Sequence, residues 1–145
     1  MQIDETDRAL IALLSENARL PVADLARRLG VARTTVQARI DRLVEKGAIA
    51  GFTVRKGSGL RAPLRATVLI SVEPRATPAV LTRLKSLTEV ETVHTTSGRF
   101  DMIAILSADD TETLDRTLDL IGEAKGVRSS ESLIHLSTRF DRGIS

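Results

Sequence analysis

The stretch Leu-Ala-Arg-Arg-Leu-Gly-Val-Ala-Arg-Thr-Thr-Val, residues 25–36, decides the fold of the N-terminal part of the chain. Two helices joined by a tight turn approach each other closely only where small or apolar side chains meet. Ala26, Gly30 four positions later and Val36 six positions after that satisfy this requirement. The spacing predicts a helix-turn-helix motif, whose second helix fits the major groove of DNA.

Apolar side chains recur at helical spacing on both sides of this motif. They predict helices over about residues 4–16, 21–29 and 32–46. The buried face of the third helix is expected to contain Val36, Ile40, Leu43 and Val44. Residues 48–54 then alternate well enough to predict a short strand, so the motif is expected to be a winged helix-turn-helix.

The outer face of the third helix carries the candidate DNA contacts. With the apolar face turned inward, the side chains expected to face out are Arg33, Thr34, Thr35, Gln37, Ala38, Arg39 and Arg42. Arginine and glutamine bond guanine and adenine through two atoms, and threonine bonds phosphates or touches a thymine methyl group. Arg39, Arg42 and the later Arg55 are assigned mainly to phosphates, which position a protein without reading sequence.

Local charge supports a phosphate partner. Residues 31–61 contain seven Lys or Arg and two Asp or Glu, although the whole chain carries a net charge of only +2. A basic patch on one element is the electrostatic footprint of a nucleic-acid binder. The alternative is a plain packing unit of three short helices with a solvated, arginine-rich face.

The second half of the chain has a different pattern. Residues 56–63 contain two glycines and a proline without periodicity and are expected to be a linker, which leaves residues 1–55 as the DNA-binding domain. Strands and helices then alternate as β-α-β-β-α-β over residues 64–145, with Thr77 expected to cap the first of these helices. The predicted fold class is α+β, a winged helix-turn-helix followed by a ferredoxin-like βαββαβ domain.

Two opposite charges flank a glycine between the two middle strands. Gly98 permits a positive φ at this junction. Arg99 and Asp101 are able to hold the carboxylate and the ammonium group of a zwitterion. The alternative interpretation is a hairpin turn with a surface salt bridge of little energetic value.

Composition limits the other classes of function. The chain has 145 residues, of which 42% are hydrophobic and 28% charged, as in globular proteins. The absence of cysteine excludes disulfides, thiolate catalysis and cysteine-ligated zinc. No segment approaches the roughly 20 apolar residues of a membrane helix, and the acidic N-terminus does not resemble a secretory signal, so we expect a cytoplasmic protein.

Both halves resemble the Lrp/AsnC family, the feast/famine transcription regulators. Residues 25–36, with Arg39-Ile40, Arg42-Leu43 and residues 45–49 after them, resemble that family's DNA-binding domain. Residues 97–101, within the β-α-β-β-α-β order, are similar to its ligand-sensing domain. The resemblance implies a sequence-specific, non-enzymatic regulator that binds a palindromic operator and responds to a small molecule, an amino acid or a related metabolite.

The resemblance also implies an assembly and an effector site. The family forms dimers through the C-terminal sheets, which often assemble into octamers, and effectors usually bind between subunits. The family's Gly-x-x-Asp stretch corresponds to Gly98 and Asp101, and the implied effector-binding set is Thr95, Thr96, Gly98, Arg99, Phe100, Asp101, Ser130 and Ser132. Two departures stand out, because Ala32 replaces a frequent serine cap of the third helix and Phe100 replaces a frequent tyrosine.

Two other functions remain open at this point. Some proteins of this architecture resemble siroheme decarboxylases, which depend on histidine around a tetrapyrrole. Here His94 and His135 lack acidic or cysteine neighbours at metal-ligand spacing, and Trp and Tyr are absent, so we expect no catalytic site, metal or cofactor. The other alternative is an architectural protein that compacts DNA.

Overall fold

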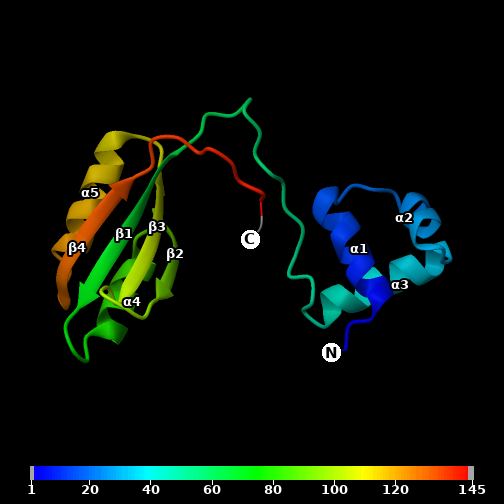
Figure 1. Ribbon diagram of the computed structural model, residues 1–145, viewed down its shortest axis with the longest axis horizontal. Coiled ribbons are helices and arrows are strands. Elements are labelled where there is room, and N and C mark those ends of the chain that lie inside the picture. Colours follow the sequence, from blue (N-terminus) through cyan, green and yellow to red (C-terminus); the bar gives the residue numbers. More distant parts are fainter. Residues whose placement is uncertain (1, 144–145) are drawn as a thin grey trace. The chain divides into compact units, whose positions relative to one another are not determined.

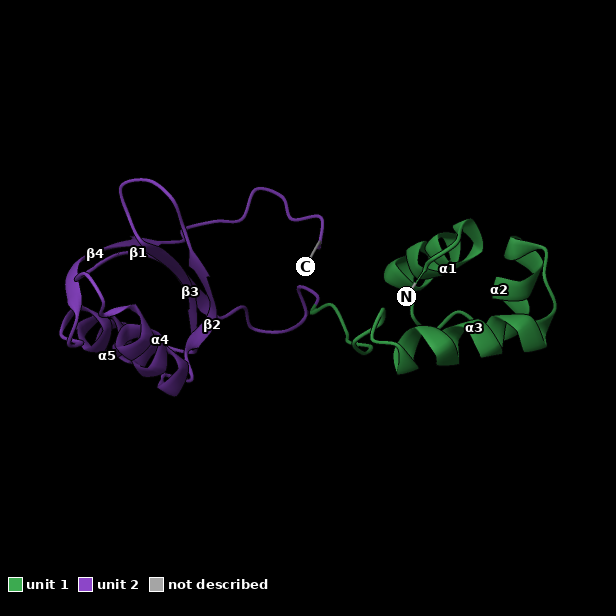
Figure 2. Cartoon of the chain, turned by 90° about the horizontal axis from the view of Figure 1, so that it is seen from below, with its two compact units in different colours: residues 1–56 green, residues 57–145 purple. Residues whose placement is uncertain are grey.

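Two separate hydrophobic cores organise the chain, whose computed structural model describes residues 2–143. One core belongs to a compact unit formed by residues 1–56, and the other to a unit formed by residues 57–145 (Figure 2). Among the described residues, none of the helices has the length and apolar character needed to cross a membrane. Each unit is therefore described on its own terms.

Unit 1 consists of three helices around a small core. These are α1 (Glu5–Glu16), α2 (Val22–Leu29) and α3 (Arg33–Glu45). Asp4 caps α1 through a reciprocal pair of hydrogen bonds with Asp7. The core side chains, one or more from every helix, are Leu10, Leu14, Leu25, Ala26, Val36 and Leu43.

The turn between α2 and α3 has the predicted helix-turn-helix geometry. Gly30 ends α2 in the left-handed region, with φ of +68°, a conformation that costs glycine nothing. The N–H of Val31 donates to the carbonyl of Ala26 at 3.1 Å, which closes the turn. Ala26 and Val36 are both buried, so the spacing argument is confirmed.

The strand expected over residues 48–54 is not formed. A strand needs a neighbouring ladder of hydrogen bonds, and unit 1 as described contains helices only. Phe52 and Val54 are 55% and 83% exposed. Val44, expected to be buried, is 43% exposed because it lies about 100° around α3 from Leu43, at the edge of the apolar stripe.

Unit 2 is a four-stranded antiparallel sheet with two helices (Figure 1). Its elements are β1 (Leu64–Val72), α4 (Thr77–Ser86), β2 (Val90–Thr95), β3 (Met102–Ala108), α5 (Thr111–Gly122) and β4 (Val127–Ile134). The strands lie in the order β2-β3-β1-β4, so the predicted βαββαβ arrangement and the α+β class are confirmed. The helix α4 begins differently from the prediction, since Ala76 rather than Thr77 is its cap residue and makes no side-chain cap bond.

The two faces of this sheet have different surroundings. Both helices lie together on one face (Figure 2), over alternate buried residues of β1 and β3. The opposite face, which we call the open sheet face, carries Leu69 across from Ile103, and Thr67 across from Ile105 and Leu133. Within the described part of unit 2 no helix covers it, and Leu133 is 48% exposed.

Candidate DNA interface and effector site

The N-terminal half of α3 presents the polar residues that the sequence predicts as base contacts. Arg33, Thr34, Gln37 and Ala38 are exposed and Thr35 is half-buried. The amide of Gln37 donates to Asp41 one turn further on, at 2.8 Å. Ala32 occupies the cap position without a side-chain hydrogen bond, as its replacement of serine predicts.

Arg39 and Arg42 lie differently from the prediction, because both face α1 and are paired with carboxylates. One guanidinium nitrogen of Arg39 contacts Asp4 at 2.8 Å and Asp7 at 3.0 Å. Arg42 contacts the other oxygen of Asp7 at 2.7 Å. The sequence did not predict these ion pairs, since a helical wheel of α3 alone does not include the acids of α1.

Asp7 is the functional-site neighbour that sequence reasoning missed. Its side chain is 0% exposed, yet it sits between two arginines of α3. The hydrogen bond from Arg39 lowers the pKa of Asp4, with a further contribution from the backbone N–H of Asp7. The hydrogen bonds that Arg39 donates to the carboxylates of Asp4, which contributes most, and Asp7 raise the pKa of Arg39. The available sequence signal is the excess of acids at the start of α1, Asp4, Glu5 and Asp7.

Arg55, the third residue assigned to phosphates, follows α3 in irregular, exposed chain. One of its guanidinium nitrogens lies 3.5 Å from the carbonyl oxygen of Glu16 at the end of α1. This is a long contact, and the side chain keeps its other donors.

The loop between β2 and β3 is held by hydrogen bonds of its own residues. Gly98 has φ of +117°, which confirms the expected positive φ. The hydroxyl of Thr96 donates to the carbonyl of Phe100 at 2.8 Å. The carboxylate of Asp101 accepts a 2.7 Å hydrogen bond from the backbone N–H of Val72 at the end of β1. Asp101 therefore ties β3 to β1.

A hollow of about 480 Å³ lies beside this loop. Its lining consists of Ser71, Arg99, Phe100, Ser129, Ser130 and Glu131. The guanidinium of Arg99 lies 3.8 Å from the carboxylate of Glu131 and 5.2 Å from the centre of the Phe100 ring. Arg99 therefore takes Glu131 as its acidic partner, where the sequence suggested Asp101.

The hollow gathers only part of the predicted effector set. Arg99, Phe100 and Ser130 line it, whereas Thr95 pairs with Met102 within the sheet and Ser132 lies across from Val68. The residues that sequence reasoning missed are Ser71, Ser129 and Glu131. Their meeting depends on the register of β1 with β4, which places Ser71 across from Ser129.

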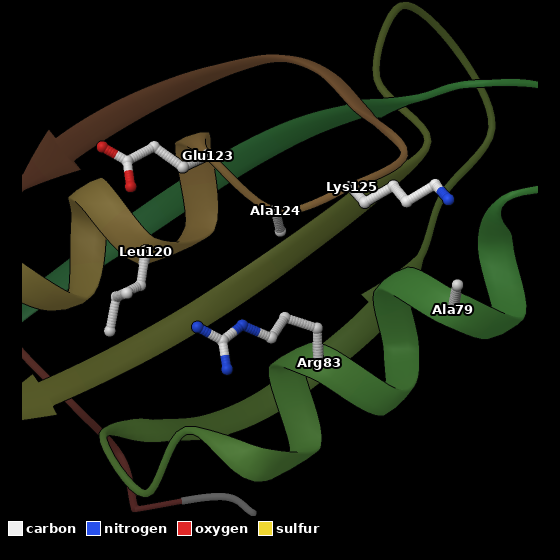
Figure 3. A pocket seen from close by; sticks show the side chains of 6 residues that line it. All are labelled: Ala79, Arg83, Leu120, Glu123, Ala124 and Lys125. Atoms are coloured by element: carbon white, nitrogen blue, oxygen red, sulfur yellow. The ribbon is translucent and has the colours of Figure 1, made fainter.

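A second hollow of about 390 Å³ lies in the helical layer of unit 2, lined by Ala79, Arg83, Leu120, Glu123, Ala124 and Lys125 (Figure 3). Arg83 extends toward Leu120, while Glu123 and Lys125 point in different directions (Figure 3). Because the charged ends of Glu123 and Lys125 point apart, they are not placed to bind the same small ligand. It contains no predicted site residue, so the hollow at Arg99 is the better candidate.

The two histidines lie apart on the sheet. His94 is exposed on β2, across from Ile103 of β3. His135 follows β4, and its Nε2 lies 2.8 Å from the hydroxyl of Thr67. Neither residue lines either hollow.

Comparison with known proteins gives matches for both units. Residues 3–44 match the AsnC-type helix-turn-helix domain, and residues 65–144 match the Lrp/AsnC ligand binding domain. The HTH-type transcriptional regulator LysM of Saccharolobus solfataricus is 32% identical over 139 residues, covering 95% of this chain and 96% of that protein.

Two solved structures are similar to this chain over nearly its full length. The structure of Escherichia coli AsnC superposes with a TM-score of 0.88 at 26% identity, covering 99% of each chain. A feast or famine regulatory protein from Mycobacterium tuberculosis, complexed with L-methionine, superposes with a TM-score of 0.82 at 27% identity, again covering 99% of each chain.

Proposed function

The chain belongs to the Lrp/AsnC family of transcriptional regulators, with a helix-turn-helix domain and a ligand-binding domain. On this basis we propose that it binds a palindromic operator as a homo-oligomer and that an amino acid regulates this binding. The observation that carries the DNA half of this proposal is the exposed, polar N-terminal half of α3 after the Gly30 turn. Because the proposed partner is DNA, we propose that the protein acts in the cytoplasm.

The proposed base contacts come from the start of α3. Arg33 and Thr34 are exposed there, and Ala38 offers a methyl group to thymine one turn later. Thr35 and Gln37 complete this surface, with Gln37 exchanging Asp41 for an adenine edge. Arg55 is proposed as a phosphate contact.

The proposed effector is a zwitterion in the hollow at Arg99. Arg99 offers its guanidinium to the carboxylate, and Glu131 offers its carboxylate to the ammonium group. The hydroxyls of Ser71 and Ser129, which face each other across β1 and β4, provide further polar partners. The complex of the M. tuberculosis relative with L-methionine supports an amino acid as the ligand class.

The proposed dimer forms through the open sheet face. Its apolar residues, Leu69, Ile103, Ile105 and Leu133, are without cover in the described part of unit 2. A two-fold dimer buries the same face twice, and two copies of α3 about one helical turn of DNA apart match a palindrome. We propose that these dimers assemble further, into a form such as an octamer.

One experiment tests the whole proposal. The full chain is incubated with fragmented DNA, the bound fragments are recovered and footprinted, and the footprint is repeated with each amino acid at millimolar concentration. Sharp protection of a palindromic site that changes with one amino acid is the expected result. Diffuse coating would support a DNA-compacting protein instead, and no binding to any duplex at low salt would overturn DNA binding altogether.

A further inference from the structure

Asp7 is the one charged side chain that is fully buried among residues 2–143. Each of its two carboxylate oxygens meets a different arginine of α3, Arg39 at 3.0 Å and Arg42 at 2.7 Å. The backbone N–H of Asp4 approaches the same carboxylate at 3.3 Å. The charge is therefore satisfied on both oxygens by groups of unit 1.

A buried carboxylate is stable only when paired and hydrogen-bonded in this way. Arg39 and Arg42 are three residues apart, on successive turns of the same face of α3. A single acid that binds both fixes the rotation of α3 about its axis and its position along α1. Arg39 is held a second time by Asp4, at 2.8 Å.

This geometry competes with the role that the sequence suggests for the two arginines. The side chain of Arg39 is only 25% exposed, and its bonding nitrogen is shared by two carboxylates. A phosphate that takes the same nitrogen would have to displace Asp4 and Asp7. Asp7 would then keep Arg42 but lose the partner of its other buried oxygen, which is costly.

We propose that Asp7, Arg39 and Arg42 form a positioning clamp that sets the recognition helix α3 for DNA, and that the two arginines affect DNA binding through this clamp rather than by holding phosphates. The inference rests on the proposed function, since it needs α3 to contact the operator. It makes Asp7, which has no exposed surface, a determinant of DNA affinity.

The sign of the effect of Asp7→Asn separates the two roles. Removing a negative charge from a DNA-binding domain should strengthen binding if only electrostatics mattered. The clamp predicts the opposite, because the amide leaves α3 free to shift and one base contact to be lost. We expect the dissociation constant to rise about tenfold or more, as loss of one bidentate base contact does. Glu5→Gln is the matched control, since it removes an exposed acid of α1 and should leave affinity equal or slightly tighter.

Salt dependence provides the second readout, with Arg42→Gln as the second variant. A lost phosphate contact reduces the slope of log affinity against log salt by about 0.9. The clamp predicts weaker binding with the wild-type slope. Arg42→Gln also keeps Arg39 on Asp7, so it decides the question if Asp7→Asn does not fold.

Fluorescence anisotropy on the operator duplex, between about 50 and 200 mM salt, measures both quantities. Circular dichroism at the same temperature confirms that each variant is folded. Unchanged or tighter binding by folded Asp7→Asn would overturn the clamp, as would a reduced slope for Arg42→Gln. Absence of binding by the wild-type protein to any double-stranded DNA would instead overturn the proposed function, and the proposed clamp with it.

Discussion

Replacement of Glu131 by glutamine tests which acid recognises the effector. The structure offers two candidates near Arg99, and they have different partners. Glu131 lines the hollow and faces Arg99 at 3.8 Å, whereas Asp101 accepts the backbone N–H of Val72 at 2.7 Å. Glu131→Gln should therefore lower amino-acid affinity, and Asp101→Asn should not, because its amide oxygen still accepts from Val72.

The size of the effect follows from the exposure of the pair. A hydrogen bond to a charged group is worth about 1.5–3 kcal/mol, or roughly 10- to 150-fold in affinity. The side chains of Arg99 and Glu131 are 83% and 53% exposed, so water screens them and the lower end applies. We expect about a tenfold loss for Glu131→Gln, with no change in thermal stability.

Asp101→Ala should show the reverse pattern. It leaves the N–H of Val72, a buried residue, without an acceptor, which costs about 1–3 kcal/mol. For a domain of this size, Tm falls by about 4–8 °C for each kcal/mol. Affinity measured well below the new Tm should be close to that of the wild type.

Isothermal titration calorimetry with the amino acid found by footprinting gives the affinities, and differential scanning calorimetry of the full chain gives Tm. Equal losses of affinity in Glu131→Gln and Asp101→Asn would refute the assignment of the ammonium partner. A stable Asp101→Ala variant with abolished binding would show that the sequence-based choice of Asp101 was the right one.

Four further outcomes are expected. Gly126→Ala should destabilise unit 2 by about 2–5 kcal/mol in thermal unfolding, because φ is +97° and the added Cβ would lie 2.7 Å from the Cβ of Ala76. Gly98→Ala has open space around it and should cost only about 1–2 kcal/mol of backbone strain. Equal losses of stability in the two variants would contradict this reasoning. Ala32→Ser should stabilise unit 1 by about 0.5–1 kcal/mol by supplying the missing cap of α3, and an unchanged Tm would count against it. The hydrogen bond from the backbone N–H of Thr113 lowers the pKa of Asp110 below 3.8. The Asp110 carboxylate therefore stabilises the fold at neutral pH, and this contribution is lost as the pH falls through the lowered pKa. Asp110→Asn should reduce the dependence of stability on pH in the acid range, and an unchanged dependence would refute the assignment. Ile105→Glu places a charge on the open sheet face and should convert dimers into folded monomers in analytical ultracentrifugation, so a dimer that persists would place the interface elsewhere.

The helix-turn-helix was predictable because its determinants are local. Ala26, Gly30 and Val36 lie within one short stretch, and their roles follow from helix geometry and from the freedom of glycine at positive φ. The alternating strands of unit 2 were predictable for a similar reason, since period-two burial on β1 and β3 is written directly into their sequences.

What sequence reasoning missed depends on contacts between distant segments. A helical wheel turned Arg39 and Arg42 outward because it contains nothing about Asp7, which is more than thirty positions earlier in the chain. The alternation of residues 48–54 suggested a strand, but pairing needs a neighbour that unit 1 does not supply. Glu131 lines the hollow because of the register of β4 against β1, and no local sequence pattern specifies that register.

The base-reading surface that we propose for one copy of α3 is small. It consists of Arg33, Thr34, Thr35, Gln37 and Ala38, of which only Arg33 and Gln37 have side chains able to make a bidentate base contact. Each good bidentate base contact is worth about 1–3 kcal/mol, while specific operators are bound about 4–10 kcal/mol more tightly than other DNA. Two such contacts from a single copy give about 2–6 kcal/mol, which reaches only the lower part of that range, and a second copy doubles the contacts. In the proposed dimer the open sheet face contributes to DNA recognition alongside α3, because the contact that joins two copies also sets the spacing of their recognition helices. An effector bound in unit 2 has a physical route to the operator by changing that spacing, without any contact to the DNA-reading residues.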